Sequence, residues 1–178
     1  MTETSGLEST RNTSSRIRPF CGVVEKWLAS AHPSPRTALE EWDGNAQLAL
    51  IPLGRGFEAV RIPEDIVHAF VGSDSPATVN ARLAEGLNGG PVIRDPGFRR
   101  YYALVPPGTA AVWRAPVAEC IAAGTYLGVP RTDRVESNGG TSTSYWSVPM
   151  SRPNGLRTAA EVLALVRVGH SLVSEDEP

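Results

Sequence analysis

Hydrophobic residues recur every three or four positions in several parts of the chain, which is the spacing of an amphipathic helix. The first such segment, 20–31, should end before Pro33, because the residue preceding a proline avoids helical backbone angles. The same spacing predicts helices over 34–42, 63–71, 76–87 and 156–168, and Gly169 is expected to end the last one. Short helices should therefore be spread over the whole chain.

Compact or alternating hydrophobic runs between turn residues predict strands between these helices. The runs lie at 47–52, 57–62, 91–94, 100–105, 124–129 and 144–148. Consecutive antiparallel strands with flanking helices are typical of the α+β class. We therefore expect a mostly antiparallel sheet covered by helices.

The first two runs are separated by Gly54-Arg55-Gly56, so they are expected to form a hairpin. Alternation in the second run places Phe57 and Ala59 on one face, which Arg61 would extend, and Glu58 on the other. The glycine-rich turn lacks the spacing of a phosphate-binding loop, which favours a plain tight turn.

The two ends of the chain differ in composition from the rest. Residues 1–18 are rich in Ser, Thr and Glu without hydrophobic periodicity, and residues 171–178 are acidic. These features predict a disordered arm and a disordered acidic tail around a single domain at 19–170. The polar, glycine-rich segment 131–143 is expected to be a mobile loop.

Composition places the chain among ordinary globular proteins. It has 178 residues, 41% hydrophobic and 20% charged, with a net charge of −2, which is enough hydrophobic content for a core. No hydrophobic run approaches the roughly 20 residues of a membrane helix, and we expect no secretory signal because residues 1–18 are polar. The sequence therefore predicts no membrane association and a cytoplasmic location.

The two cysteines, Cys21 and Cys120, lie far apart, and His32, His68 and His170 do not cluster with them. Zinc needs three or four ligands, so no metal site is expected. Two free thiols in a reducing compartment are the interpretation, with a disulfide as the alternative. The histidines also lie far from any nucleophile motif, which argues against a hydrolase triad.

Charge and aromatic residues concentrate in the second half of the chain. The segment 94–157 holds eight arginines and four acidic residues, and could contact an anionic partner or neutralise the acidic segment 19–93. Guanidinium groups beside aromatic rings can hold phosphates and stack bases, and such a set lies at Arg94, Arg99, Arg100, Tyr101 and Tyr102. The alternative is one core tyrosine with a solvated arginine rim. The tryptophans are expected in the core, although Trp113 and Trp146 could line a groove.

Four phrases in order resemble one known family. They are GRGFEAVRIP (54–63), GPVIRDPGFRRYYALVPPGT (90–109), GTYLGVP (124–130) and YWSVP (145–149). Together they resemble the N-terminal domain of actinobacterial bifunctional DNA primase/polymerases, in the archaeo-eukaryotic primase superfamily, and more closely short actinobacterial relatives of that domain. The resemblance covers roughly 20–170. It implies a split fold, with an α/β part beside a recognition-motif-like sheet.

The resemblance also implies where catalytic residues would lie. Active members use an acidic-x-acidic motif for two metals, a histidine in a following strand for the nucleotide, and a third carboxylate. This chain keeps only Glu58 of the acidic pair, offers Tyr101 and Tyr102 instead of the histidine, and has only Glu119 near the third position. Because such carboxylates stabilise the transferring phosphoryl group through their metals, the departures imply the fold without the chemistry.

The leading hypothesis is therefore a catalytically inactive accessory or regulatory domain that binds nucleic acid or nucleotide weakly and needs no cofactor. Its contacts would be Arg99, Arg100, Tyr101 and Tyr102, supported by Arg94 and Arg55. One alternative is a protein-interaction module whose tail and arm dock a protein partner. A second is an active polymerase with a rearranged Mg²⁺ or Mn²⁺ site, in which Glu58 would be essential.

Overall fold

The computed structural model describes residues 19–135 and 143–175, with only the backbone of residues 19–21. The predicted arm at 1–18, most of the predicted loop at 131–143 and the end of the predicted tail lie outside the described residues. The described chain is α+β, with antiparallel sheets and flanking helices, as the sequence predicts.

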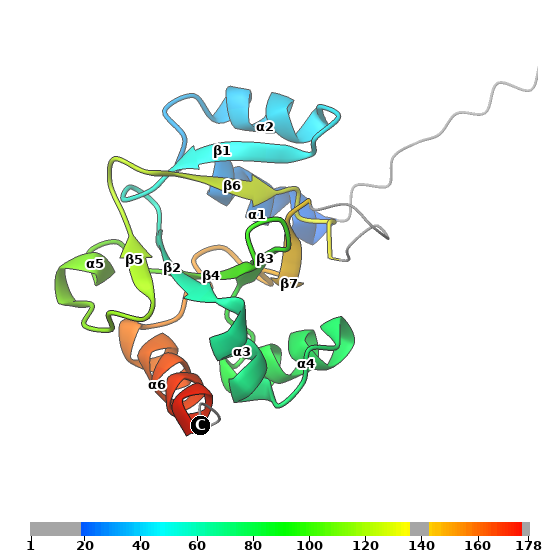
Figure 1. The fold of residues 1–178 in the computed structure, drawn as a ribbon. Helices are drawn as coiled ribbons and strands as arrows, with labels where there is room; N and C mark the ends of the chain where they lie inside the picture. The colour runs from blue at the N-terminus through cyan, green and yellow to red at the C-terminus, as the bar shows by residue number, and fades with distance from the viewer. Residues whose placement is uncertain (1–18, 136–142, 176–178) are drawn as a thin grey trace, which may run out of the picture.

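Within the described residues, the strands form one antiparallel sheet of five strands and a separate antiparallel ribbon of two (Figure 1). The larger sheet has the order β5–β2–β4–β3–β7. Its strands are β2 (Glu58–Pro63), β3 (Val92–Asp95), β4 (Arg100–Val105), β5 (Glu119–Ile121) and β7 (Tyr145–Val148). The ribbon pairs β1 (Leu48–Pro52) with β6 (Tyr126–Pro130).

The predicted hairpin of the first two strands is wrong. β1 pairs with β6, whereas β2 pairs with β4 and β5. Both strands carry a fully buried hydrophobic face, with Ile51 of β1 and Ala59 of β2 in the same core cluster. The two strands therefore pack face to face in different layers instead of pairing edge to edge.

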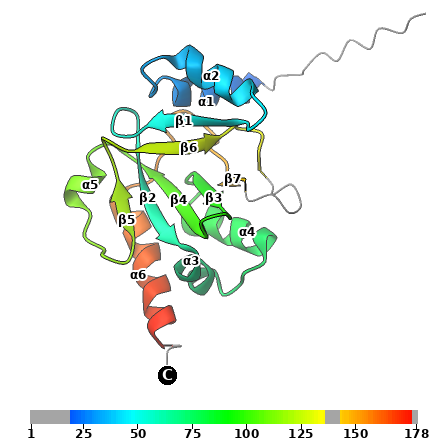
Figure 2. The same cartoon turned by 45° about the horizontal axis from the view of Figure 1, so that its top comes forward.

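Helices cover both sides of the larger sheet (Figures 1 and 2). On one side, α1 (Pro19–Ala29) and α2 (Pro35–Asp43) pack together with the ribbon. On the other lie α3 (Glu64–Val71), α4 (Pro76–Gly86) and α6 (Ala159–Glu175), and the short α5 (Thr109–Val112) lies beside β5. Proline occupies the first turn of α2 and α4, where its missing N–H has no helical partner in any case.

The sheet separates two hydrophobic cores. Alternation along β4 sends Leu104 into the core beneath α1, α2 and the ribbon, and Ala103 into the core beneath α3, α4 and α6. The alternation predicted for β2 is confirmed. Trp42, Trp113 and Trp146 are buried, and their indole N–H groups donate to backbone carbonyls at 2.8, 2.6 and 3.0 Å. They anchor the cores, as expected.

Gly169 does not end the last helix, contrary to the prediction. It is buried where α6 crosses α3, and a Cβ there would lie 2.8 Å from Cγ2 of Ile66 and closer still to its carbonyl oxygen. The glycine therefore permits close packing of the two helices, and α6 continues to Glu175. The first half of the predicted tail is consequently helical.

Two further features bear on the sequence predictions. Cys120 is a half-buried free thiol in β5, while the side chain of Cys21 lies outside the described residues. None of the helices described in the structure combines the length and apolar character needed to cross a membrane.

Candidate functional site

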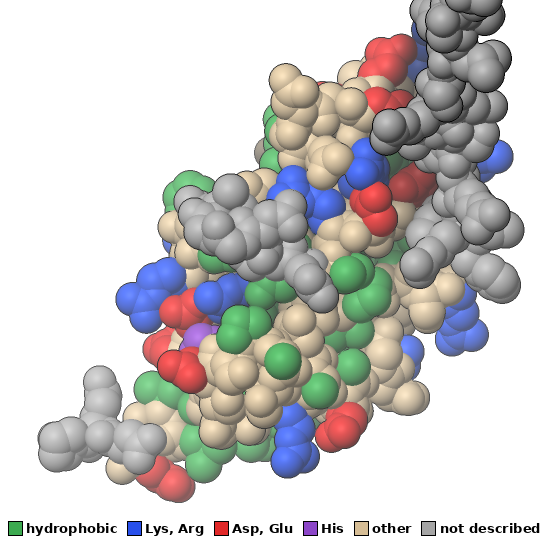
Figure 3. Space-filling model, turned by 90° about the vertical axis from the view of Figure 1, so that its right-hand side faces the viewer, with side chains coloured by type: hydrophobic (Ala, Val, Ile, Leu, Met, Phe, Trp, Pro, Cys, Tyr) green, Lys and Arg blue, Asp and Glu red, His purple; other side chains and the backbone are tan. Residues whose placement is uncertain are grey.

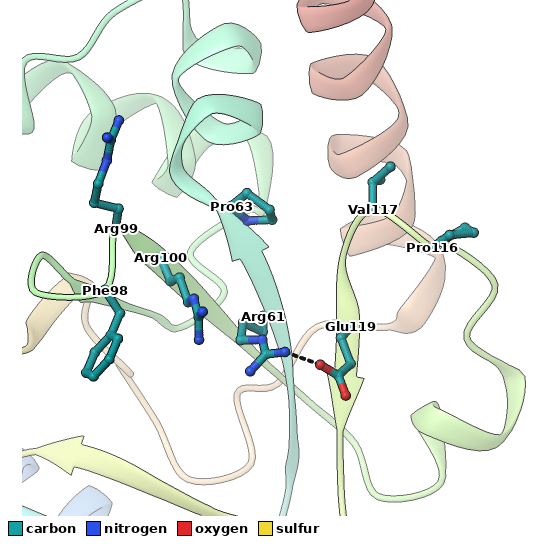
Figure 4. A pocket seen from close by; sticks show the side chains of 8 residues that line it. All are labelled: Arg61, Pro63, Phe98, Arg99, Arg100, Pro116, Val117 and Glu119. Atoms are coloured by element: carbon teal, nitrogen blue, oxygen red, sulfur yellow. Dashed lines mark hydrogen bonds and ion pairs between the residues drawn. The ribbon is translucent and has the colours of Figure 1, made fainter.

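A cleft opens on the ribbon side of the larger sheet, where two adjoining cavities share Arg61 and Phe98. The first, the arginine cavity, has a volume of about 450 Å³ (Figure 4). Its lining is Arg61, Pro63, Phe98, Arg99, Arg100, Pro116, Val117 and Glu119. The second, the aromatic cavity, has a volume of about 540 Å³. Its lining includes the apolar and aromatic residues Leu48, Phe98, Tyr102, Ile121, Tyr126 and Leu127, together with Arg61, with Asp95 of β3 and with Thr125, Thr143 and Ser144, which precede β6 and β7.

Strand register brings the centre of the cleft together. Arg61 in β2 lies directly opposite Tyr102 in β4 on one side and Glu119 in β5 on the other. Side chains of directly opposite residues share one face of a sheet, so all three project toward the cleft. Arg61 and Glu119 form an ion pair there, with 36% and 59% of their side chains exposed (Figure 4).

The turn between β3 and β4 forms another wall of the cleft. Phe98 at its tip is 70% exposed, and the guanidinium of Arg100 lies 5.7 Å from the Phe98 ring centre. Arg100 points from the start of β4 toward Arg61, whereas the guanidinium of Arg99 points away from both (Figure 4). An exposed ring and a nearby guanidinium therefore face the same open space.

Glu64 at the start of α3 holds this turn in place. Its backbone N–H donates to the Arg99 carbonyl at 3.1 Å, and its carboxylate accepts from Arg99 Nε at 2.8 Å and from Arg94. Burial acts to raise the pKa of Glu64, but the hydrogen bonds and charges of Arg99 and Arg94 outweigh it and lower that pKa. The carboxylate is thus charged at neutral pH and ties the turn to α3.

The structure divides the six predicted binding residues between different surfaces. Arg100 and Tyr102 line the cleft, and Arg99 lies at its rim. Arg94 and Tyr101 lie on the opposite face of the sheet. Arg55 is exposed in the turn between β1 and β2 and lines neither cavity. The six residues therefore do not form one continuous surface.

Arg94 and Tyr101 belong to the interior contacts of the α3 side. The Arg94 guanidinium forms an ion pair with Glu64 and lies 4.5 Å from the Tyr101 ring centre. Tyr101 is only 3% exposed, and burial raises the pKa of its phenol well above the ordinary value. Its hydroxyl lies 3.3 Å from His68 Nε2. These side chains stabilise the packing of α3 on the sheet and are not available for stacking with a base.

Glu58, the candidate remnant of an acidic pair, points to the face opposite the cleft. It is 6% exposed, and its carboxylate accepts hydrogen bonds from the backbone N–H groups of Gly108 at 2.8 Å and Ala110 at 2.7 Å. Burial, together with the Glu58 charge, raises the pKa of the neighbouring Cys120 thiol to about 12. Glu58 therefore anchors the connection from β4 into α5, and Cys120 remains a protonated thiol at neutral pH.

The residues toward the cleft on β2 are Ala59 and Arg61. Because they occupy alternate positions of one strand, they share its cleft-facing side, and neither is a carboxylate. Among the residues that the structure describes, no group of three or more His, Cys, Asp and Glu side chains is placed to hold a metal ion. The cleft thus combines cationic and aromatic groups with two carboxylates, Glu119, which is paired with Arg61, and Asp95 of the aromatic cavity.

Four important cleft residues, Arg61, Phe98, Tyr126 and Glu119, were not assigned to a binding site from the sequence. Phe98 directly follows the predicted Asp-Pro-Gly turn, in the connection between β3 and β4. Its place at the tip of a turn was the signal from which an exposed ring could have been predicted. Tyr126 lies within the predicted strand 124–129, but that strand belongs to the two-stranded ribbon, which the sequence does not reveal. Glu119 lies in β5, which is too short to show alternation, so its pairing with Arg61 had no local signal.

Charges of both signs are also intermixed on the surface of the molecule. On the face shown in Figure 3, basic and acidic side chains lie next to one another, with hydrophobic side chains scattered between them. The charges on that face are mixed and are not gathered into a basic strip.

No family model, curated protein or solved structure matches this chain. The resemblance to primase-polymerases accordingly rests on the four phrases of the sequence.

Proposed function

We propose that this chain is a catalytically inactive, primase-polymerase-like accessory domain of the cytoplasm that binds single-stranded nucleic acid in the cleft. The observation that carries the proposal is the position of Arg61, Arg100 and the exposed Phe98 ring at the junction of the two cavities. A nucleotide unit needs a cationic group for its phosphate and a flat hydrophobic surface for its base. The cleft offers both, side by side.

The phosphate would lie in the arginine cavity. Arg100 forms no ion pair with a carboxylate in the described part of the chain, so its donors are free for a ligand. A guanidinium presents its donors in a fixed planar fork that matches phosphate oxygens. Arg61 lies in the same cavity, whereas the Arg99 guanidinium at the rim is paired with Glu64.

The base would lie in the aromatic cavity. Its volume of about 540 Å³ falls in the usual range for small-ligand sites, and Phe98, Tyr102 and Tyr126 contribute rings to its wall. Base-on-ring stacking contributes about 1–3 kcal/mol per base and tolerates any sequence. The cleft should consequently bind a single strand with little sequence preference.

Two observations support a primase-polymerase-like architecture without catalysis. The ribbon with α1 and α2 stands beside the five-stranded sheet, which agrees with a two-part fold having a cleft between the parts. At the cleft, the β2 side chains are Ala59 and Arg61, and the positive charge of Arg61 repels a metal ion. Binding is therefore expected to persist in EDTA.

The test is fluorescence anisotropy with a 5′-fluorescein-labelled oligo(dT) in EDTA, titrated at several salt concentrations. Arg100→Ala should weaken binding and flatten the plot of log Kd against log salt by about 0.7, the slope of roughly one lost single-strand phosphate contact. Arg82→Ala, an exposed arginine of α4 on the other side of the sheet, is the matched control. Equal losses in both variants, or no binding at low salt, would contradict the proposal and favour a protein-interaction module.

A further inference from the structure

The Arg61–Glu119 ion pair lies inside the arginine cavity, where a bound phosphate would have to contact Arg61. The two residues are direct cross-strand partners of β2 and β5, and Figure 4 shows the carboxylate turned toward the guanidinium. Arg61 therefore already holds an anion, the carboxylate of a residue in the same chain.

This ion pair has the features of one that an external anion can displace. Both side chains are substantially exposed, and β5 is an edge strand of only three residues. Exposed ion pairs add little to stability, so the fold does not depend on this one. Glu64 is the contrasting case, because its carboxylate is largely buried and held by two arginines.

Glu119 also sets the charge of the cavity. Arg61 and Arg100 carry two positive charges and Glu119 carries one negative charge, while the Arg99 guanidinium points away toward its partner Glu64. The net charge near the ligand position is thus about that needed by one phosphodiester. A triphosphate would bring several negative charges close to the Glu119 carboxylate, where the repulsion grows with each charge.

We infer that Glu119 is a specificity-determining residue of the cleft. It competes with ligand phosphate for Arg61, and it makes the cleft select a single-stranded phosphodiester over a free nucleoside triphosphate. This inference rests on the proposed function of the cleft. It predicts that removing the Glu119 charge improves triphosphate binding more than strand binding.

The experiment compares wild type, Glu119→Gln and the matched control Glu40→Gln in EDTA. Glu40 forms an exposed ion pair with Arg36 on α2, so the control removes the same charge from a similar pair outside the cleft. Labelled oligo(dT) reports strand binding by anisotropy, and unlabelled dTTP competes with it. We expect Glu119→Gln to tighten strand binding about threefold and dTTP binding about tenfold or more, and Glu40→Gln to change neither appreciably.

A second arm isolates Arg61. In the presence of Arg61, Glu119→Gln should steepen the salt dependence of strand binding by about 0.7, because one more phosphate contact forms. In an Arg61→Ala background the same substitution should leave the slope unchanged. Circular dichroism melting of each variant checks that the fold is retained.

The outcomes separate the two ideas. If wild type binds the strand and Glu119→Gln improves both ligands equally, or no more than Glu40→Gln does, the role of Glu119 is refuted while the binding function stands. If wild type and Glu119→Gln bind neither ligand at low salt, the proposed function itself fails. Strong dTTP competition against wild type would also overturn the specificity.

Discussion

Glu58→Ala distinguishes a structural carboxylate from a remnant of a metal site. The carboxylate is nearly fully buried and accepts two backbone hydrogen bonds, from Gly108 and Ala110, at 2.8 and 2.7 Å. Hydrogen bonds to a charged group contribute about 1.5–3 kcal/mol each, and their loss leaves buried donors without a partner. Water that enters the space left by the side chain can bond to the two freed N–H groups, which keeps the loss at the lower end of the sum for two such bonds. We therefore expect the free energy of unfolding to fall by about 3 kcal/mol.

The assay is urea unfolding followed by circular dichroism, combined with the oligo(dT) titration on the folded variant. Glu58→Gln is the matched control, because its amide oxygen can still accept one of the two hydrogen bonds, and it should lose less stability than the alanine variant. Strand affinity should stay within about twofold in both, since Glu58 lies on the face opposite the cleft. Wild-type stability together with lost metal-dependent nucleotide incorporation in Glu58→Ala would refute this reasoning and support the enzyme alternative.

Three further predictions concern packing and titration. Gly169→Ala should lower the free energy of unfolding by about 1–3 kcal/mol in urea, despite the better helix propensity of alanine, because the new Cβ would clash with Ile66. The substitution of an exposed residue of the same helix, Ser171→Ala, is the control. A Gly169→Ala variant more stable than wild type would contradict the close packing of α6 on α3. The lowered pKa of Glu64 means that its stabilising contribution is present above its ordinary pKa of 4.5 and is lost as the pH falls through the folded-state pKa. The gap in urea midpoint between wild type and Glu64→Gln should therefore be wide at pH 6 and shrink at pH 3.5, and a constant gap would argue against this ion pair. Burial and the charge of Glu58 raise the pKa of the Cys120 thiol to about 12. In a Cys21→Ser background, alkylation of Cys120 should therefore be slow at pH 8, and it should be faster when Glu58→Gln is added. Rapid alkylation of the Cys21→Ser variant alone would contradict the burial of the thiol.

Local periodicity was sufficient to find most elements but not their pairing. The predicted helices and strands match α1–α4 and the longer strands within a few residues, because each carries several hydrophobic positions, whereas α6 continues seven residues beyond the predicted end. β5 and α5 have three and four residues, too few for a period to show. The pairing of β1 with β6 joins segments more than 70 residues apart, and no local pattern encodes such a contact. Gly169 was misread because a packing glycine and a helix-ending glycine look alike in sequence.

The candidate site shows the same division between local and long-range information. Strand alternation puts Arg100 and Tyr102 on one face of β4 and Tyr101 on the other. Binding residues predicted at adjacent positions of this strand therefore could not all lie on one surface. Strand alternation could not predict that Arg61 pairs with Glu119, since the two residues meet only because β2 pairs with β5. Chemistry that depends on neighbouring strands therefore required the structure.

The most direct test of the central claim is to map where a single strand contacts the protein. An oligo(dT) carrying a photoreactive 4-thiothymidine is crosslinked in EDTA at low salt, and the adducts are located by mass spectrometry. The proposed function predicts adducts on the β3–β4 turn and the start of β4, at Phe98 and Tyr102, and at Tyr126 of β6. These adducts should be lost when unlabelled strand is added in excess. Adducts confined to α4 or α6, on the other side of the sheet, would contradict the assignment of the cleft as the binding site.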